Sequence, residues 1–169
     1  MLYVLCGENE FDKRQKLAAL IAGGAAPERY DGEQLDAASL RDIMQGQSLF
    51  TLERTVIISR LSDNSALWAE LPEITISGST KVVLLESKLD KRTKTYKWLR
   101  KNAEIYEFTP LSDRQKPQLA KWCVDEASKR GYALSAVQAE TLIDRLGYDQ
   151  LRLSNFIEQL SFAGEITDD

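Results

Sequence analysis

The chain has 169 residues, of which 43% are hydrophobic and 28% charged, a composition typical of one large or two small folded domains. Its net charge of −4 argues against nucleic-acid binding over the whole surface, although a local basic patch is compatible with that value. The sequence has no histidine, which excludes Ser-His and Cys-His nucleophile pairs, histidine general bases and histidine-bound zinc.

Cysteine usage and hydropathy exclude further classes of protein. Cys6 and Cys123 are too far apart in the sequence for a zinc-ligand spacing, and we expect both to be reduced and buried. The longest apolar runs, such as VVLL, are too short to cross a bilayer. The N-terminal stretch MLYVLCGENEF lacks the basic start of a secretory signal. We therefore expect a cytoplasmic protein with no membrane contact, no metal and no cofactor.

Strand-like and helix-like segments alternate over the first two thirds of the chain. Apolar, β-branched stretches predict strands, and apolar residues at helical spacing predict helices, with Asp36 as one N-cap. In chain order these are strand 2–6, helix 9–22, strand 28–32, helix 35–45, strand 54–61, helix 64–73, strand 81–87, helix 90–102 and strand 104–108. The continuous apolar character of 81–87 is typical of a central parallel strand. This alternation predicts an α/β domain with a Rossmann-like parallel sheet.

The pattern changes at TPLSD, residues 109–113. Only helices are predicted after it, over 113–130, 135–146 and 149–163, with glycines between them. We therefore predict an α/β domain over residues 1–110 and a small helical domain over residues 111–169. The last residues, AGEITDD, have the composition of a linker rather than of a packed terminus.

A glycine directly after the first strand invites comparison with a phosphate-binding loop, which reads G-x-x-x-x-G-K-[ST]. After Gly7 the chain reads ENEFDKR. Lys13 falls at the position of the lysine, but Asp12 replaces the second glycine and Arg14 replaces Ser/Thr. The three acids of this stretch would repel phosphate, and the strand 54–61 runs into Arg60 rather than an acidic pair that could hold magnesium. A simpler interpretation is that the acids favour a helix N-terminus. We expect no working phosphate loop.

The stretch QGQSLF, residues 45–50, places Leu49 and Phe50 side by side just before the apolar run TVIIS. Two interpretations remain open at this point. The pair covers an edge of the protein's own sheet, or it forms an apolar anchor for a pocket on a partner. Interfaces of the second kind concentrate their binding free energy in a few buried side chains.

The stretch SKLDKRTKTYKWLRK, residues 87–101, is strongly basic. It contains seven basic residues against one acid, Asp90. The basic residues are Lys88, Lys91, Arg92, Lys94, Lys97, Arg100 and Lys101. They could contact DNA phosphates or an acidic neighbouring subunit, or could simply face solvent. Tyr96 and Trp98 could stack on bases, but their helical spacing favours core packing. Arg152, near the start of the last helix, is interpreted as a surface residue unless a nucleotide binds.

Together these segments resemble the delta subunit of the bacterial DNA polymerase III clamp loader. The resemblance rests on YVLCGENEF, ERYDGEQLD, QSLF-TLERTVIISRL, KVVLLESKLDKRTKTYKWL, YEFTPLSDRQ and DQLRLSNFIEQL, in this order and spacing. It extends over essentially the whole chain. The stretch LDKRTKTYK followed by EFTPLSDRQ is fairly specific to this family. QSLF is too short to indicate the family alone, and it supports the resemblance only because it lies directly before a strand.

The resemblance implies an AAA+-like Rossmann domain followed by a small helical lid domain. It implies a subunit of a DNA polymerase holoenzyme with no catalytic activity of its own, which binds the sliding clamp (the beta subunit) and opens it for loading onto primed DNA without hydrolysing ATP. Carried over by position, Ser48, Leu49 and Phe50 match the apolar plug that enters the clamp. Gln45 matches an upstream glutamine, although Gly46 departs from the usual form of the motif and leaves the contact of Gln45 open.

The resemblance also implies a helical collar domain that joins the other clamp-loader subunits, and this chain stops where the linker to it would begin. We expect such a piece to be monomeric, to bind the clamp and not to assemble the loader. Two rival functions remain: a nucleotide-binding enzyme on the same sheet, and a DNA-binding module that uses residues 88–101. Saturable binding of ATP with magnesium would indicate the first, and an affinity that falls steeply with salt would indicate the second.

Overall fold

A computed structural model describes residues 1–46 and 54–163 of the protein. The chain divides into two compact units. The first comprises Met1–Glu8 and Asp12–Phe108, and the second comprises Asn9–Phe11 and Thr109–Asp169. Each unit is described below by itself.

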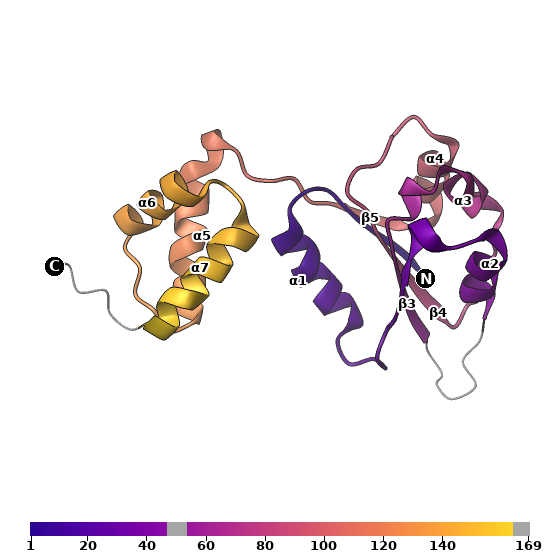
Figure 1. The fold of residues 1–169 in the computed structure, drawn as a ribbon, viewed down its shortest axis with the longest axis horizontal. Helices are drawn as coiled ribbons and strands as arrows, with labels where there is room; N and C mark the ends of the chain where they lie inside the picture. The colour runs from indigo at the N-terminus through magenta and orange to yellow at the C-terminus, as the bar shows by residue number, and fades with distance from the viewer. Residues whose placement is uncertain (47–53, 164–169) are drawn as a thin grey trace. The chain divides into compact units, whose positions relative to one another are not determined.

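The first unit is built on a five-stranded sheet with the strand order β2-β3-β4-β1-β5 (Figure 1). All neighbouring strands run parallel, which confirms the predicted α/β class. Val4 of β1 lies opposite Leu84 of β4 on one side and Ile105 of β5 on the other. The strands are β1 (Leu2–Cys6), β2 (Glu28–Asp31), β3 (Arg54–Ser59), β4 (Thr80–Leu85) and β5 (Glu104–Glu107).

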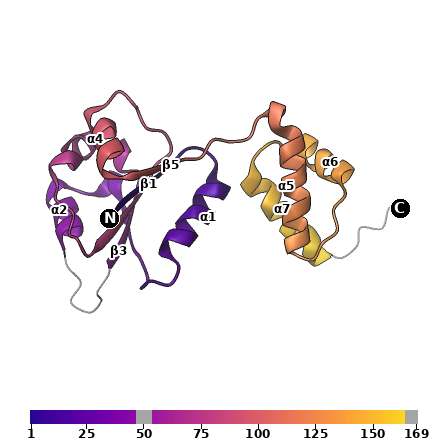
Figure 2. The same cartoon turned by 180° about the vertical axis from the view of Figure 1, so that it is seen from behind.

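Helices cover both faces of this sheet, as Figures 1 and 2 show from opposite sides. Helix α1 (Glu10–Ile21) lies on one face, where Leu17 packs with Leu5, Ile57 and Val83. Helices α2 (Ala37–Gln45), α3 (Ser65–Glu70) and α4 (Lys94–Asn102) lie on the other face over a larger core. The alternate side chains of each central strand are therefore buried on both faces, which explains the unbroken apolar sequences of β3 and β4.

All four helices of this unit are shorter than predicted, and α3 and α4 differ most. Helix α4 begins at Lys94 rather than at residue 90, because the Asp90 carboxylate accepts a hydrogen bond from the backbone N of Arg92 (2.9 Å) and holds a turn there. Thr93 then caps the helix by accepting from the backbone N of Tyr96 (3.1 Å). Helix α3 ends at Glu70, and Pro72 lies in the 3₁₀ turn Leu71–Glu73 that follows.

The second unit contains α5 (Lys116–Lys129), α6 (Ala136–Leu146) and α7 (Gln150–Ala163), preceded by a 3₁₀ turn over Asp113–Gln115. Its core includes Leu119, Cys123, Ile143, Leu153 and Ile157, all of which are buried. Burial raises the pKa of the Cys123 thiol to about 11, so this cysteine is a protonated core residue at neutral pH.

Local signals fix the ends of these helices. Ser135 and Gln138 form a reciprocal capping box at the start of α6. Gly131 and Gly147 follow α5 and α6 with positive φ values of 73° and 84°, conformations that glycine adopts without strain. Across residues 1–46 and 54–163, we find no helix with the length and apolar character that crossing a membrane requires.

Candidate functional site

The loop between β1 and α1 was the first site to test, because a nucleotide would bind there in an ATP-hydrolysing relative of this fold. Gly7 has a φ of 115°, and a Cβ on it would lie 2.0 Å from the carbonyl oxygen of Phe108. Its backbone N–H donates to the carbonyl oxygen of Ser87 (2.8 Å). The glycine is therefore required by the close approach of Phe108, and its N–H is already bonded within the protein.

Lys13 occupies the position of the phosphate-loop lysine, but its amine bonds to the protein. The side chain is buried, with 7% of its surface exposed. Its Nζ donates to the carbonyl oxygens of Gly7 (2.9 Å) and Glu86 (3.2 Å). A lysine that neutralises phosphate must direct its ammonium toward the ligand. Here the same ammonium joins the β1–α1 loop to the end of β4.

Glu86, which directly follows β4, binds the loop after β3 at the same edge of the sheet. Its buried carboxylate accepts hydrogen bonds from the backbone N of Leu61 (3.1 Å), the backbone N of Ser62 (3.3 Å) and the Ser62 hydroxyl (2.5 Å). Burial raises the pKa of Glu86, and the bonds from Ser62 and Leu61 partly oppose that rise. The carboxylate thus holds the loop after β3 against the end of β4, at the edge where parallel sheets usually bind ligands.

Arg60, which directly follows β3, also differs from a magnesium-binding residue. It has a φ of 59°, the only positive value among the non-glycine residues of 1–46 and 54–163. Its guanidinium pairs with Asp31, the last residue of the neighbouring strand β2, and at 2.7 Å with Glu33, which follows that strand. The residues at the ends of β2 and β3 are therefore joined by an arginine. In the described part of the chain, no cluster of side chains is suited to hold a metal ion.

The second candidate site is the connection from α2 to β3, which carries the predicted apolar pair. Gln45 is exposed and is the last residue of α2. Ser48, Leu49 and Phe50 lie outside the described residues. Helix α2 itself is well anchored, because Asp36 caps its start by accepting from the backbone N of Ser39 (2.7 Å). Its inner face buries Leu40, Ile43 and Met44.

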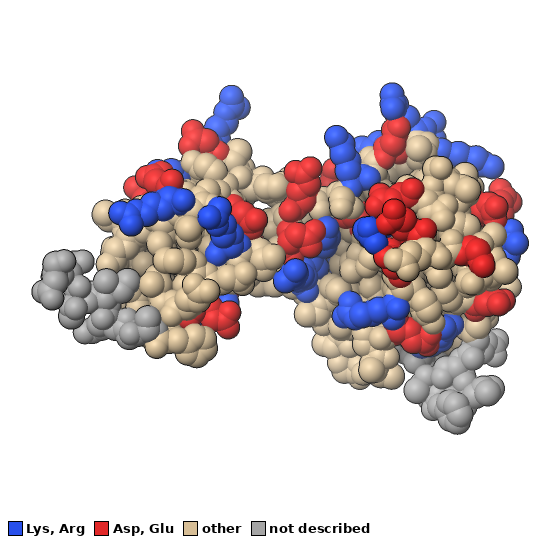
Figure 3. All heavy atoms as spheres, in the orientation of Figure 1, with Lys and Arg blue, Asp and Glu red and all other residues tan. Residues whose placement is uncertain are grey.

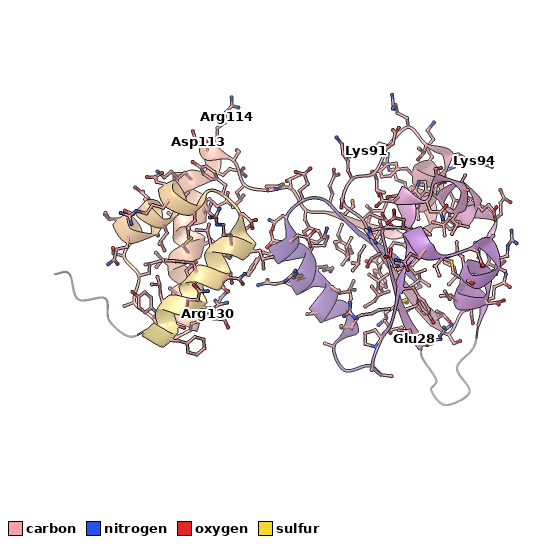
Figure 4. The ribbon with its side chains drawn as sticks, in the orientation of Figure 1. Glu28, Lys91, Lys94, Asp113, Arg114 and Arg130 are labelled. Carbon is pink, nitrogen blue, oxygen red and sulfur yellow. The ribbon has the colours of Figure 1, made fainter. Side chains whose placement is uncertain are left out.

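Arg54, the first residue of β3, binds the carbonyl end of α2. Its Nη1 donates to the carbonyl oxygens of Ile43 (2.7 Å) and Gly46 (3.4 Å). Its Nε and Nη2 bond both oxygens of Glu28, at 2.6 Å each, so one side chain links α2, β2 and β3. This pairing lowers the pKa of Glu28 to about 2. Figure 4 labels Glu28 at this end of the sheet.

The close packing around Gly46 leaves no room for a side chain at this position. A Cβ on it would lie 2.7 Å from the carbonyl oxygen of Asp42 and 3.0 Å from Nη1 of Arg54. Its carbonyl oxygen accepts from the Thr80 hydroxyl (3.2 Å), and the Met44 carbonyl accepts from the backbone N of Ser77 (3.0 Å). Both flanks of residues 47–53 are therefore held by bonds to the sheet. The sequence carried no signal for Arg54, since a lone arginine at a strand start has many roles.

The third candidate site is the basic stretch. The structure places Lys88, Lys91 and Arg92 in the loop before α4, and Lys94, Lys97, Arg100 and Lys101 on α4 itself. Leu89 and Leu99 are buried, and Tyr96 and Trp98 pack half-buried against the same core, as their helical spacing predicted. Lys91 pairs with Glu107 (2.7 Å) and Arg92 with Asp90 (2.9 Å).

Arg152 is an exposed residue in the first turn of α7, in the second unit. Asp149 caps that turn by accepting from the backbone N of Leu151 (2.9 Å) and of Arg152 (3.2 Å). The described contacts of Arg152 are therefore those of an ordinary residue at a helix start.

Comparison with solved structures shows which proteins share this fold. No protein-family model and no curated protein matches the sequence. The five-stranded parallel sheet, covered on both faces and followed by a helical unit, is an α/β fold like that of AAA+ domains, and it matches several solved structures.

One such match is the Bacillus subtilis DNA clamp loader delta protein (YqeN), which covers 97% of this chain with a TM-score of 0.64 and 20% identity. A RuvB mutant from Thermotoga maritima covers 96% with a TM-score of 0.54 and 13% identity. The Walker-type ATPase of Pyrococcus abyssi covers 97% with a TM-score of 0.52 and 11% identity. The chain spans 54% of the first two proteins and 63% of the third. At these identities the likeness establishes a shared fold.

Proposed function

We propose that the protein is a non-catalytic clamp-loader subunit of the delta type, which binds and opens a sliding clamp during DNA replication. The observation that carries the proposal is the state of the β1–α1 loop. The fold is that of AAA+-type proteins, but the amine of Lys13 bonds the carbonyl oxygens of Gly7 and Glu86 instead of facing a ligand. A protein that keeps this fold without a phosphate loop fits a role in binding rather than in hydrolysis.

The likeness to a clamp loader delta protein supports the finer assignment. We assign the clamp contact to Leu49 and Phe50, with Ser48 beside them and Gln45 at the end of α2. Two adjacent apolar side chains suit an interface that buries a few anchors in a pocket. Arg54 acts as a positioning residue in this proposal, because it ties Gly46, just before the segment, to β3, just after it. The other clamp-loader subunits and primed DNA would be partners within the complex.

Alanine replacement of the proposed anchors tests the assignment. We expect Leu49→Ala with Phe50→Ala to lose affinity for the cognate sliding clamp by about 2–4 kcal/mol for each anchor that is a hot spot. Surface plasmon resonance with the clamp immobilised would measure this loss. Val137 and Phe162 provide a matched control, because they are exposed apolar residues of the helical unit, 75% and 84% exposed. Clamp affinity that is unchanged in the anchor variant, or equally reduced in the control, would refute the site.

A further inference from the structure

A cavity of about 540 Å³ opens between α3 and the start of α4 in the α/β unit. Small-molecule binding sites have volumes of about 300–1,000 Å³, so this cavity is large enough for such a ligand. Its walls come from the turn after β3, from α3 and from the connection between β4 and α4. It therefore lies beyond the carboxyl ends of two neighbouring strands, where open parallel sheets usually bind ligands. We refer to it as the α3–α4 cavity.

The buried wall of the α3–α4 cavity offers an apolar surface. Trp68 of α3 and Leu89 of the β4–α4 connection both line it, and each is 8% exposed. Thr95 of α4 is also buried in this wall, and its hydroxyl donates to the carbonyl oxygen of Trp68 (2.7 Å). This bond joins α3 to α4, and both apolar side chains pack in the core of the unit. The apolar wall is therefore formed before any ligand binds.

Two exposed cations line the same cavity. Lys88 comes from the β4–α4 connection and Lys94 is the first residue of α4. Figure 3 shows Lys and Arg side chains gathered beside α4, where Figure 4 labels Lys94. Lys94 pairs with Glu73 at 3.5 Å, with both side chains more than two thirds exposed. Among the residues that the structure describes, no ion pair involves Lys88. Both ammonium groups can therefore turn toward an anion in the cavity.

Two acids also line the cavity, and one of them is already neutralised. Asp90 accepts hydrogen bonds from Nε (3.0 Å) and Nη2 (2.9 Å) of Arg92, and this pairing lowers the pKa of Asp90 to about 2. Asp63 is the other acid, and it is exposed. Two cations thus face one acid that has no arginine partner of this kind. This balance favours a ligand with a single negative charge.

We propose that the α3–α4 cavity binds a small organic carboxylate with an apolar body. The apolar body lies against Trp68 and Leu89, and the carboxylate accepts hydrogen bonds from the ammonium groups of Lys88 and Lys94. A doubly charged phosphate ester fits less well, because its second charge would meet Asp63. An uncharged apolar molecule would make no use of the two lysines.

Nuclear magnetic resonance of the whole 19.1 kDa chain tests the proposal, with phenylbutyrate as the probe. The chain has three tryptophans, so a proton–nitrogen correlation spectrum resolves the indole signals of Trp68, Trp98 and Trp122. We expect phenylbutyrate to shift the Trp68 signal saturably in the millimolar range, as suits its size, and to leave the signal of Trp122 in the helical unit in place. The absence of a saturable shift at Trp68 would overturn the proposal.

The uncharged analogue phenylbutanamide and two charge variants test the role of the lysines. We expect the amide to bind about fivefold more weakly than the carboxylate, because it lacks two exposed charge pairs. Lys88→Gln with Lys94→Gln should weaken carboxylate binding about fivefold and leave amide binding unchanged. Lys97→Gln with Lys101→Gln is the matched control, because it removes two exposed cations of α4 that do not line the cavity. Equal losses in the two variants, or equal affinities of carboxylate and amide, would contradict the charge assignment.

Two leucine variants of α3 test whether the probe occupies the cavity itself. Ala69 lines the cavity and is exposed, whereas Ala66 is exposed on the same helix and lies outside it. Ala69→Leu would fill part of the cavity and should remove the saturable shift with both probes. Ala66→Leu should bind both probes like the parent chain. Circular dichroism checks that these surface changes leave the fold intact. If the two variants bind alike, the probe binds elsewhere and the site is wrong.

A last comparison separates this site from the clamp contact. Leu49→Ala with Phe50→Ala should bind phenylbutyrate like the parent chain, whatever it does to clamp affinity. If phenylbutyrate leaves the Trp68 signal in place and the cognate clamp shifts it, the cavity is a protein contact and the small-ligand assignment is wrong.

Discussion

Replacement of Arg54 by methionine removes the hydrogen bonds that hold the end of α2 and leaves a side chain of similar length. Arg54 is mostly buried, with 14% of its side chain exposed. A charged donor to a buried carbonyl contributes about 1.5–3 kcal/mol, and a cation at a helix C-terminus about 0.3–1 kcal/mol more. The pair with Glu28 adds little, about 0–1 kcal/mol, because Glu28 is 43% exposed. We therefore expect Arg54→Met to lower the free energy of unfolding by about 2–4 kcal/mol.

Glu28→Gln provides the comparison, because it removes the charge partner and leaves the bonds from Arg54 to Ile43 and Gly46 in place. We expect it to cost at most about 1 kcal/mol. Urea denaturation followed by tryptophan fluorescence measures both costs, and hydrogen exchange of α2 amides tests whether the loss begins at the helix end. If Arg54→Met costs no more than Glu28→Gln, or if the α2 amides exchange as in the parent chain, Arg54 does not anchor this helix.

Three further predictions follow from described contacts. Gly7→Ala should destabilise the α/β unit by more than about 2 kcal/mol, because Gly7 has a positive φ and a Cβ on it would clash with the carbonyl oxygen of Phe108. Gly78→Ala is the control, because no atom lies within 4 Å of the new Cβ, and it should change stability little in the same urea titration. Because the pKa of Glu28 is lowered from 4.5 to about 2, its pairing contributes stability above about pH 5 that is lost as pH falls toward 2; stability of Glu28→Gln measured over this range should fall less steeply, and an identical acid dependence would contradict the pairing. Titration with ATP and magnesium should give no saturable change in tryptophan fluorescence at micromolar concentrations, since Lys13 is already bonded within the protein, and a saturable change would support the nucleotide-binding rival.

Much of the fold could be predicted from local sequence, because each strand and helix carries its own signal. A near-continuous apolar run identified β4 as a central strand, β-branched residues identified β3 as a strand, and Asp36 identified the start of α2. The start of α4 was predicted too early, because helical composition begins at residue 90 but the Asp90 turn and the Thr93 cap compete with the helix there. Propensity alone does not resolve that competition.

The candidate sites could be predicted only in part. The prediction that no phosphate loop works here rests on Asp12 and Arg14, which replace residues that such a loop requires. The hydrogen-bond partners of the Lys13 amine could not be predicted, because one of them, the carbonyl oxygen of Glu86, is 73 positions away in the sequence. The hydrogen bonds from Arg54 to the end of α2 were also missed, because a lone arginine at a strand start can have many roles. Bonds between a side chain and a distant backbone group leave no periodic pattern in a sequence.

The bond from Lys13 to Glu86 has a consequence for how this protein responds to cellular energy. In a protein that binds nucleotide at this edge, the ligand contributes to the stability of the bound state, which therefore varies with ligand concentration. Here the amine of Lys13 bonds to backbone carbonyl oxygens of the protein, and in the proposed function this contribution to stability is the same whether ATP or ADP is present. If the proposed function holds, the α/β unit is a constant part of the assembly it joins, and movements timed by hydrolysis originate in neighbouring subunits.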